Sequence, residues 1–272
     1  MNTLTGRRVI VTGAAGTFGR LLCDRFTAAG ARVVGLDLRD GDVNGVPVLG
    51  CDLTDSSASA AGVGRAVDQL GGLDLLINNA GVGGPAPAEY APGEAARRQL
   101  EVNLIAAWNT TAAAMPALET ARGRVIFVSS RMAVLPLPLA AAYGVSKRAL
   151  AAYADALRLE AGTHIGVTVV YPSMVESPIH DATVQAGLSL QGVSRYEPAA
   201  GVVDAIVKAA TSPKPLRDVA TTSRGRFEMA IARHFPRVAG AMVRRTIAAR
   251  IAAGDLNNAP LAAGMIRRHT AK

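Results

Sequence analysis

The chain is poor in cysteine, histidine and aromatic residues. Its 272 residues include two cysteines, four histidines and one tryptophan, and aromatic side chains make up 4% of the total. Cys23 and Cys51 have neither the spacing of a disulfide framework nor that of a zinc site, so we expect a reduced protein without a metal site. The scarcity of aromatics and the lack of any binding module argue against a nucleic-acid partner.

Long hydrophobic runs are also missing. No charge-free apolar stretch approaches the roughly 18 residues that a membrane-spanning helix needs. A strand-like segment begins near residue 7, which leaves no room for a signal peptide. We therefore expect a soluble, cytoplasmic protein that contacts a membrane at most from its surface.

The apolar content is sufficient for a large core. Half of the residues are hydrophobic, and 272 residues are enough for one large α/β domain. No internal repeat or linker divides the sequence. We expect residues 1–272 to form a single domain.

Positive charge is concentrated at the C-terminal end. Residues 1–207 carry 16 Lys/Arg against 18 Asp/Glu, a net charge of −2, whereas residues 208–272 carry 13 against 3, a net charge of +10. The overall charge of +8 therefore comes from the last quarter of the chain.

A glycine-rich turn follows the first predicted strand. The β-branched run of residues 7–12 leads into TGAAGTFG, a helical segment and a second strand that ends at Asp37. This order is typical of a dinucleotide-binding turn, in which the helix N-terminus faces the pyrophosphate. Asp37 would accept hydrogen bonds from ribose hydroxyls and repel a 2′-phosphate, which favours NAD over NADP, although Arg39 acts in the opposite direction. The alternative is an ordinary tight turn with a surface aspartate.

Strands and helices alternate along most of the sequence. This pattern predicts an α/β fold of the Rossmann type, a doubly wound parallel sheet of about seven strands with helices on both faces. We expect the segment GLSLQGVSRYE, residues 187–197, to move over the substrate. The predicted strands include VIVT, VVGLD, VPVLG, LDLLIN, RVIFV, GVTVVY and RDVA.

A tyrosine and a lysine lie four residues apart on a predicted helix. Positions i and i+4 share a helix face, so the Tyr143 phenol and the Lys147 ammonium can meet. A cation about 5 Å from a phenol, whose pKa is about 10, favours the phenolate by roughly 3 kcal/mol, about two pKa units. Ser130, at the end of a strand, could bond a substrate oxygen that faces the tyrosine. The alternative is a chance spacing on a solvated helix face.

An asparagine lies inside the helix predicted over residues 94–119. Asparagine is a poor residue in a helix interior, so Asn103 requires an explanation. It is either functional or a buried amide that bonds neighbouring backbone.

Several motifs follow one another along the chain in the order TG…G, NNAG, Asn103, Ser130, Tyr143-x-x-x-Lys147 and YPSMVESP. With these motifs, residues 5–210 resemble the classical branch of the short-chain dehydrogenase/reductases. The resemblance implies that Tyr143 is the general acid/base, that Lys147 tunes it and binds the nicotinamide ribose, that Ser130 orients the substrate oxygen, and that Asn103 holds a relay water. Residues 211–272 would add a last strand and a basic helical extension. The resemblance also implies a homodimer or homotetramer. The implied cofactor-binding residues are Gly13, Thr17, Phe18, Gly19, Asp37, Asp52, Leu53, Asn79, Ala80, Gly81, Tyr143, Lys147, Pro172, Val175 and Ser177.

The glycine turn departs from the family pattern. It reads TGxxGxxG, with Gly16 and Thr17 out of register with the usual TGxxxGxG. This spacing resembles the extended branch, so an epimerase-like enzyme is an alternative to an alcohol–ketone oxidoreductase. A regulator that senses NAD(H) without turnover is a second alternative.

Apolar residues near the predicted site suggest a lipophilic alcohol or ketone, steroid-like or lipid-like, as the substrate. The alternative is that several of these apolar residues simply belong to the hydrophobic core. His164 and His180 have no partner spacing, so we expect both at the surface. The candidate pocket residues are Met132, Val134, Leu135, Leu137, Met174 and Ile179.

The basic C-terminal segment predicts two helices broken near Pro236. Phe227, Ile231 and Phe235 fall at four-residue steps and give the first helix an apolar stripe. Three roles are open: a structural cap or subunit contact, peripheral attachment to anionic lipid, and attraction of an anionic substrate.

Overall fold

The computed structural model describes residues 3–188 and 196–270. Within these ranges one sheet has the strand order β3-β4-β2-β1-β5-β6-β7-β8. All neighbouring strands are parallel except β3 and β4. The strands are β1 Arg8–Thr12, β2 Arg32–Asp37, β3 Gly41–Val43, β4 Val46–Gly50, β5 Leu75–Asn78, β6 Arg124–Val128, β7 Gly166–Tyr171 and β8 Asp218–Ala220.

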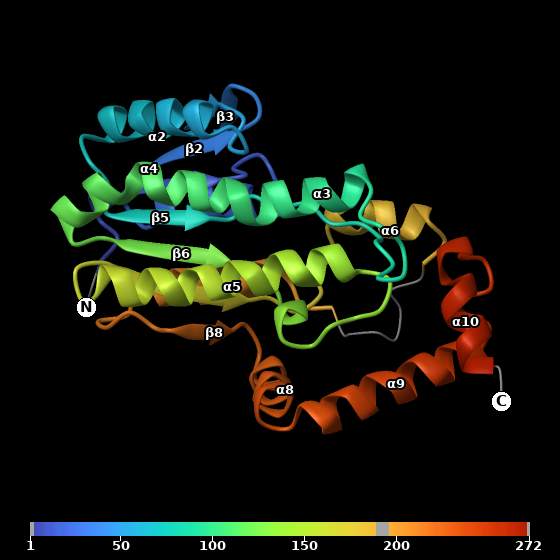
Figure 1. The fold of residues 1–272 in the computed structure, drawn as a ribbon. Coiled ribbons are helices and arrows are strands. Elements are labelled where there is room, and N and C mark those ends of the chain that lie inside the picture. Colours follow the sequence, from blue (N-terminus) through green and yellow to red (C-terminus); the bar gives the residue numbers. More distant parts are fainter. Residues whose placement is uncertain (1–2, 189–195, 271–272) are drawn as a thin grey trace.

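Helices cover both faces of the sheet, and Figure 1 shows the face that carries α2, α4 and α5. The core between the sheet and α2, α4 and α5 is separate from the core between the sheet and α1 and α7. The helices are α1 Thr17–Ala28, α2 Ser56–Leu70, α3 Glu94–Leu100, α4 Ala106–Ala121, α5 Ala141–Ala161, α6 Asp181–Gln185, α7 Ala199–Thr211, α8 Ser223–His234, α9 Pro236–Ala252 and α10 Ala263–Thr270. This arrangement confirms the predicted Rossmann-type architecture.

Alternating side chains on the central strands explain the two cores. In β1, Ile10 belongs to one core, whereas Val9 and Val11 belong to the other. In β6, Phe127 and Ile126 divide in the same way. Since the strands are buried on both faces, they read in the sequence as continuous apolar runs.

The sheet has one strand more than the approximate number expected. The additional strand, β3, pairs antiparallel with β4 and forms an edge hairpin. Asn44 and Gly45 form its turn with φ values of 51° and 86°. Asn-Gly is the preferred pair for a two-residue hairpin turn, so the signal for β3 is present in the sequence.

The order of the strands locates the ligand crevice. The chain builds outward from β1 through β2 and then returns to place β5 on the other side of β1. Ligands in open α/β sheets bind at the carboxyl ends of the strands where the order reverses. The loops after β1 and β5 therefore meet at the expected binding edge.

The C-terminal segment folds into an arm, defined here as residues 223–270. Figure 1 shows α8 beside β8, α9 extending along the outside of the sheet domain, and α10 at its far end. The break between α8 and α9 falls at Phe235, immediately before Pro236, which confirms the predicted pair of helices. No helix in the described ranges is both long enough and apolar enough to cross a bilayer.

The predicted apolar stripe of α8 does not pack on the core. Phe227 is 68% exposed and Phe235 is 61% exposed, whereas Met229 is buried. The four-residue spacing was therefore wrong as a guide to the inward face of α8, which carries Met229 and lies nearly half a turn away from the stripe. The predicted mobile segment 187–197 includes residues 189–195, which lie outside the described residues.

Candidate active site

A large cavity lies at the carboxyl ends of the central strands. Its volume is about 1300 Å³, and its wall extends from the glycine turn past Tyr143 to the arm. Single small-molecule sites usually have volumes of about 300 to 1000 Å³. The cavity can therefore hold two molecules, one at each end.

The glycine turn at one end of the cavity packs closely against the backbone of the loop after β5 and against the first turn of α1. Gly13 has φ 64°, and a Cβ there would lie 2.8 Å from the Cα of Ala80. A Cβ on Gly19 would lie 2.0 Å from the carbonyl oxygen of Gly13. Neither position tolerates a side chain. Gly19 lies under the turn rather than on the cavity wall, so its contribution is to pack α1 against the turn.

The first turn of α1 faces the same end of the cavity. Gly16 precedes the helix and provides no side-chain cap, and Thr17 and Phe18 line the wall. The first amides of a helix have no partner within the helix and attract anions. This turn fits a phosphate-containing cofactor despite its atypical glycine spacing.

Thr12 joins the turn after β1 to the loop after β5. Its hydroxyl accepts hydrogen bonds from the backbone N–H groups of Asn79 (2.9 Å) and Ala80 (3.0 Å). In return, Asn79 Nδ2 donates to the carbonyl oxygens of Thr12 (2.9 Å) and Gly13 (3.2 Å). Thr12 is a functional residue that was not predicted, although it is the first residue of the TGAAGTFG motif.

Two aspartates lie on the wall near the glycine turn. Asp37 accepts hydrogen bonds from the N–H groups of Ala15 (2.9 Å) and Leu38 (2.8 Å), which fixes its carboxylate beside the turn. Asp52 accepts from the Oγ1 and N–H of Thr54, and these bonds lower its pKa. Leu53 lines the same region. The predicted Asp37, Asp52 and Leu53 are thus together.

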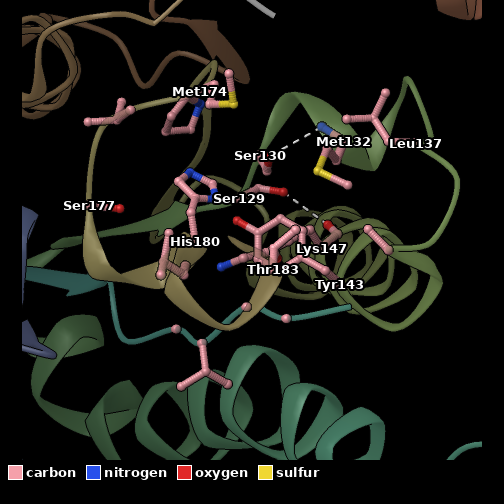
Figure 2. Close-up of a pocket in the computed structure, with 18 of the residues that line it drawn as sticks. Ser129, Ser130, Met132, Leu137, Tyr143, Lys147, Met174, Ser177, His180 and Thr183 are labelled. Atoms are coloured by element: carbon pink, nitrogen blue, oxygen red, sulfur yellow. Dashed lines mark hydrogen bonds between the residues drawn. The ribbon is translucent and has the colours of Figure 1, made fainter. Parts of the chain in front are cut away.

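Ser130, Tyr143 and Lys147 meet in the middle of the cavity (Figure 2). Ser130 follows β6, while Tyr143 and Lys147 lie on the first turns of α5. The Lys147 Nζ lies 5.8 Å from the centre of the Tyr143 ring and donates to the Val128 carbonyl at 3.0 Å. The structure therefore brings together the three groups that the spacing predicted.

Burial controls the pKa values of Tyr143 and Lys147. It raises the pKa of Tyr143 to about 12, although a hydrogen bond with Ser130 acts in the opposite direction. It lowers the pKa of Lys147 to about 8. The net shift of the Tyr143 pKa is therefore opposite to the one that a nearby lysine alone predicts, because burial of the phenol dominates it.

Asn103 lies beneath the cavity. Its side chain is fully buried, accepts from the N–H of Val82 (2.8 Å) and donates to the Val82 carbonyl (3.0 Å) and the Ser146 hydroxyl (2.9 Å). A single π-helical turn, Glu101–Ile105, carries it between α3 and α4. Such turns concentrate at functional sites. Its bonds to Val82 are those expected of a buried amide that bonds neighbouring backbone, the alternative to a functional role.

Gly81 separates Asn103 from Lys147. A Cβ at this glycine would lie 3.2 Å from both Asn103 Oδ1 and Lys147 Nζ. Asn79, Ala80 and Gly81 all line the cavity, as predicted. Any larger residue at position 81 would disturb the lysine.

The segment after β7 closes another side of the cavity. Pro172, Val175 and Ser177 are on its wall, as predicted. His180 is there too, half-buried, and burial lowers its pKa. Its predicted surface location was wrong because the turn after Ser177 directs it inward (Figure 2), whereas His164 is exposed as expected.

Most of the predicted apolar pocket residues line the cavity. Val134 is the exception, since it packs against the core beneath α5. The arm contributes further lining residues, which could not be placed at the cavity from their position in the sequence. The predicted residues on the wall are Met132, Leu135, Leu137, Met174 and Ile179.

Comparison with known proteins places the chain in a family. The short chain dehydrogenase model matches residues 7–187, well over half of the chain. The chain therefore belongs to the short-chain dehydrogenases, and this membership supports an NAD(P)-dependent oxidoreductase of alcohols and ketones.

Individual relatives agree with this assignment. The chain is 36% identical over 193 residues to an uncharacterized oxidoreductase of Myxococcus xanthus, covering 66% of this chain and 76% of that protein. It is 32% identical over 167 residues to a 3-ketodihydrosphingosine reductase of Bacteroides thetaiotaomicron, covering 60% and 62%. The chain thus spans less than two thirds of the second relative.

A solved structure shares the fold. A short chain dehydrogenase from Burkholderia cenocepacia, crystallised with NADP, is 26% identical with a TM-score of 0.77, covering 89% of this chain and 98% of that one.

Proposed function

We propose that the protein interconverts a secondary alcohol and a ketone by hydride transfer, with Tyr143 as the general acid/base. The observation that carries this proposal is the meeting of Ser130, Tyr143 and Lys147 in the same cavity as the glycine turn. A bound nicotinamide dinucleotide would supply or accept the hydride. The protein's own residues would position the substrate and move the proton.

Each residue at the centre has a separate task. In ketone reduction, the Tyr143 hydroxyl donates its proton to the carbonyl oxygen, while the Ser130 hydroxyl holds the same oxygen. The Lys147 ammonium lies close enough to stabilise the phenolate left behind. Asn103 is a positioning residue that fixes Val82 and thereby the loop beside Lys147.

The cofactor would lie along the predicted binding residues. The amides of Thr17 and Phe18 suit the pyrophosphate, and the Asp52 carboxylate suits the adenine amino group. Gly13, Ala80 and Gly81 leave room for the cofactor where their backbones approach it. Pro172, Val175 and Ser177 would lie beside the nicotinamide, near Tyr143 and Lys147.

We infer a preference for NAD over NADP from Asp37. Its carboxylate is held at the edge of the cavity by two backbone amides and would repel a 2′-phosphate. Asp37→Asn is expected to improve NADPH binding relative to NADH by at least about tenfold, because a unit charge near a phosphate costs a few kcal/mol at an effective dielectric near 20. Fluorescence titration with both reduced cofactors measures the ratio.

A matched variant controls for the loss of charge itself. Asp42→Asn, in the β3–β4 hairpin, removes a carboxylate that does not line the cavity. Its NADPH-to-NADH ratio should equal that of the parent protein. A parent protein that already binds NADPH more tightly would contradict the inferred preference.

The substrate end of the cavity favours a lipophilic alcohol or ketone. Apolar side chains from the loops after β6 and β7 surround Tyr143. The test is a panel of secondary alcohols and ketones of graded size with NAD(H) and NADP(H), with absorbance of the reduced cofactor as the readout. Turnover of apolar members is expected, and a panel without any turnover would contradict the proposal.

Exposed apolar side chains support two kinds of partner. On α4 and α5, Trp108 is 50% exposed and Leu159 is 86% exposed, which suits burial in a homodimer or homotetramer. On the arm, exposed Phe227 and Phe235 lie among arginines, which suits peripheral contact with anionic lipid. Light scattering would measure the mass of the homo-oligomer.

Contact of the arm with anionic lipid has a separate test. If it occurs, co-sedimentation of the protein with phosphatidylserine vesicles is expected to weaken at high salt and in Phe227→Ser.

A further inference from the structure

Helix α9 presents an apolar stripe to the cavity. Ala239, Met242, Val243, Thr246 and Ile247 all line the wall. Their spacing of three and four residues places them on one face of the helix. The opposite face carries exposed arginines.

In the part of the chain that the structure describes, little protein covers this stripe. Of the 17 residues of α9, Ala239 is the one that is fully buried, and Met242 is 52% exposed. An amphipathic helix normally buries its apolar stripe in a core. In α9 the space in front of the stripe is the cavity itself.

The near end of the arm is held firmly. Met229 of α8 is buried in the main core, and Glu228 pairs with Arg131, the residue after Ser130. Arg233 adds a 3.0 Å ion pair with Asp218, the first residue of β8. Helix α8 is therefore docked on the sheet domain beside the site.

The far end of the arm is also held. Leu256, Ala262 and Met265 form a small core with Leu188, while Arg268 pairs with Glu89 at 2.8 Å. Helix α9 thus bridges two anchored ends. Ile247, at the far end of its stripe, packs against the small core, whereas among the described residues the stripe from Ala239 to Thr246 faces the cavity. A wall of this kind is suited to reversible binding of an apolar ligand.

We propose that α9 forms the distal wall of the substrate site and binds the apolar body of an elongated alcohol or ketone whose reacting carbon lies at Tyr143. This proposal rests on the proposed function and specifies its substrate class. The arm lies beyond residues 7–187, to which the family model extends. The wall is therefore a specificity element outside the part of the chain shared with the family model.

The charges beside the stripe favour an apolar occupant over an anionic one. Both Arg131 and Arg224 pair with Glu228. Arg250, at the end of the stripe, lies 3.4 Å from Asp255. These arginines are already paired within the protein, so an anionic substrate would have to compete with carboxylates for them.

Displacement of a fluorescent probe tests the proposal without turnover. The full-length protein with anilinonaphthalenesulfonate in the cavity would be titrated with methyl ketones of increasing chain length. Burial of one methylene strengthens binding about fourfold, so the half-displacing concentration should fall by about that factor per added methylene. In Val243→Asp the longer ketones should lose this gain.

Two further variants make the result decisive. Ala248→Asp adds the same charge to the exposed face of α9 and should keep the parent slope. Val243→Phe should shift the best ligand to shorter chains because it fills the cavity. A parent-like slope in Val243→Asp, or equal loss of slope in Ala248→Asp, would overturn the proposal.

The same ketones separate this inference from the proposed function. Turnover with reduced cofactor but no dependence on chain length would overturn the α9 wall and leave the reaction intact. Length-dependent displacement without any turnover would contradict the reaction and leave an apolar site against α9.

Discussion

Replacing Tyr143 with phenylalanine is expected to lower kcat for ketone reduction by about a hundredfold to ten-thousandfold, the usual contribution of a general acid. The variant keeps the ring on the cavity wall and removes only the hydroxyl beside Ser130. Burial keeps the phenol protonated at neutral pH, since it raises the pKa to about 12. Affinity for the cofactor should stay within a few-fold. Steady-state absorbance and fluorescence titration measure the two effects.

Tyr153→Phe is the matched control for this variant. Tyr153 lies on the same helix but stacks on Trp108, with ring centres 4.5 Å apart, away from the cavity wall. Its loss should leave kcat nearly unchanged. Near-normal turnover in Tyr143→Phe would remove the tyrosine from the mechanism, and equal losses in both variants would indicate damage to α5.

The glycine turn and the Ser130, Tyr143 and Lys147 group could be predicted because their geometry is largely local. Four residues on a helix fix a shared face, and a parallel sheet brings the ends of β1, β5 and β6 to one edge. Asn79 meets Gly13 for the same reason. The order of the elements was therefore enough to assemble the site.

The electrostatics of the site could not be predicted from spacing. The sequence shows that a lysine can reach Tyr143, but burial depends on segments far away in the chain. Val128 and Gly81 enclose the Lys147 ammonium, and their proximity follows from the packing of the whole sheet. Desolvation then reverses the expected direction of the tyrosine pKa shift.

The orientation of the helices in the arm could not be predicted from the sequence for a related reason. Periodicity identified two helices but not which face turns inward, because α8 is oriented by ion pairs such as Arg131–Glu228 rather than by its phenylalanines. His180 was misplaced because it lies on a turn, where no periodicity applies. By contrast, the Asn44-Gly45 turn carried a usable hairpin signal for β3.

Replacing Lys147 with methionine is expected to lower kcat for ketone reduction by about a hundredfold to a thousandfold, the usual effect of removing a group that stabilises developing charge. Methionine fills much of the same buried space but cannot stabilise the Tyr143 phenolate or bond the Val128 carbonyl. The free energy of unfolding could change in either direction, because a buried charge and its hydrogen bond are lost together. Thermal unfolding would verify that the variant folds.

The pH profile separates the charge of Lys147 from its volume. Burial lowers the lysine pKa to about 8, so the ammonium is charged below that pH and neutral above it. Reduction by the parent protein should therefore slow as the pH rises through about 8, whereas Tyr143 stays protonated throughout because its pKa is about 12. Lys147→Met should be slow at every pH and lack this fall. Arg148→Met, which removes an exposed charge from the next position, should retain it. If the fall near pH 8 persisted in Lys147→Met, another group would have to carry the titration, and the stabilising role would pass from the lysine to that group.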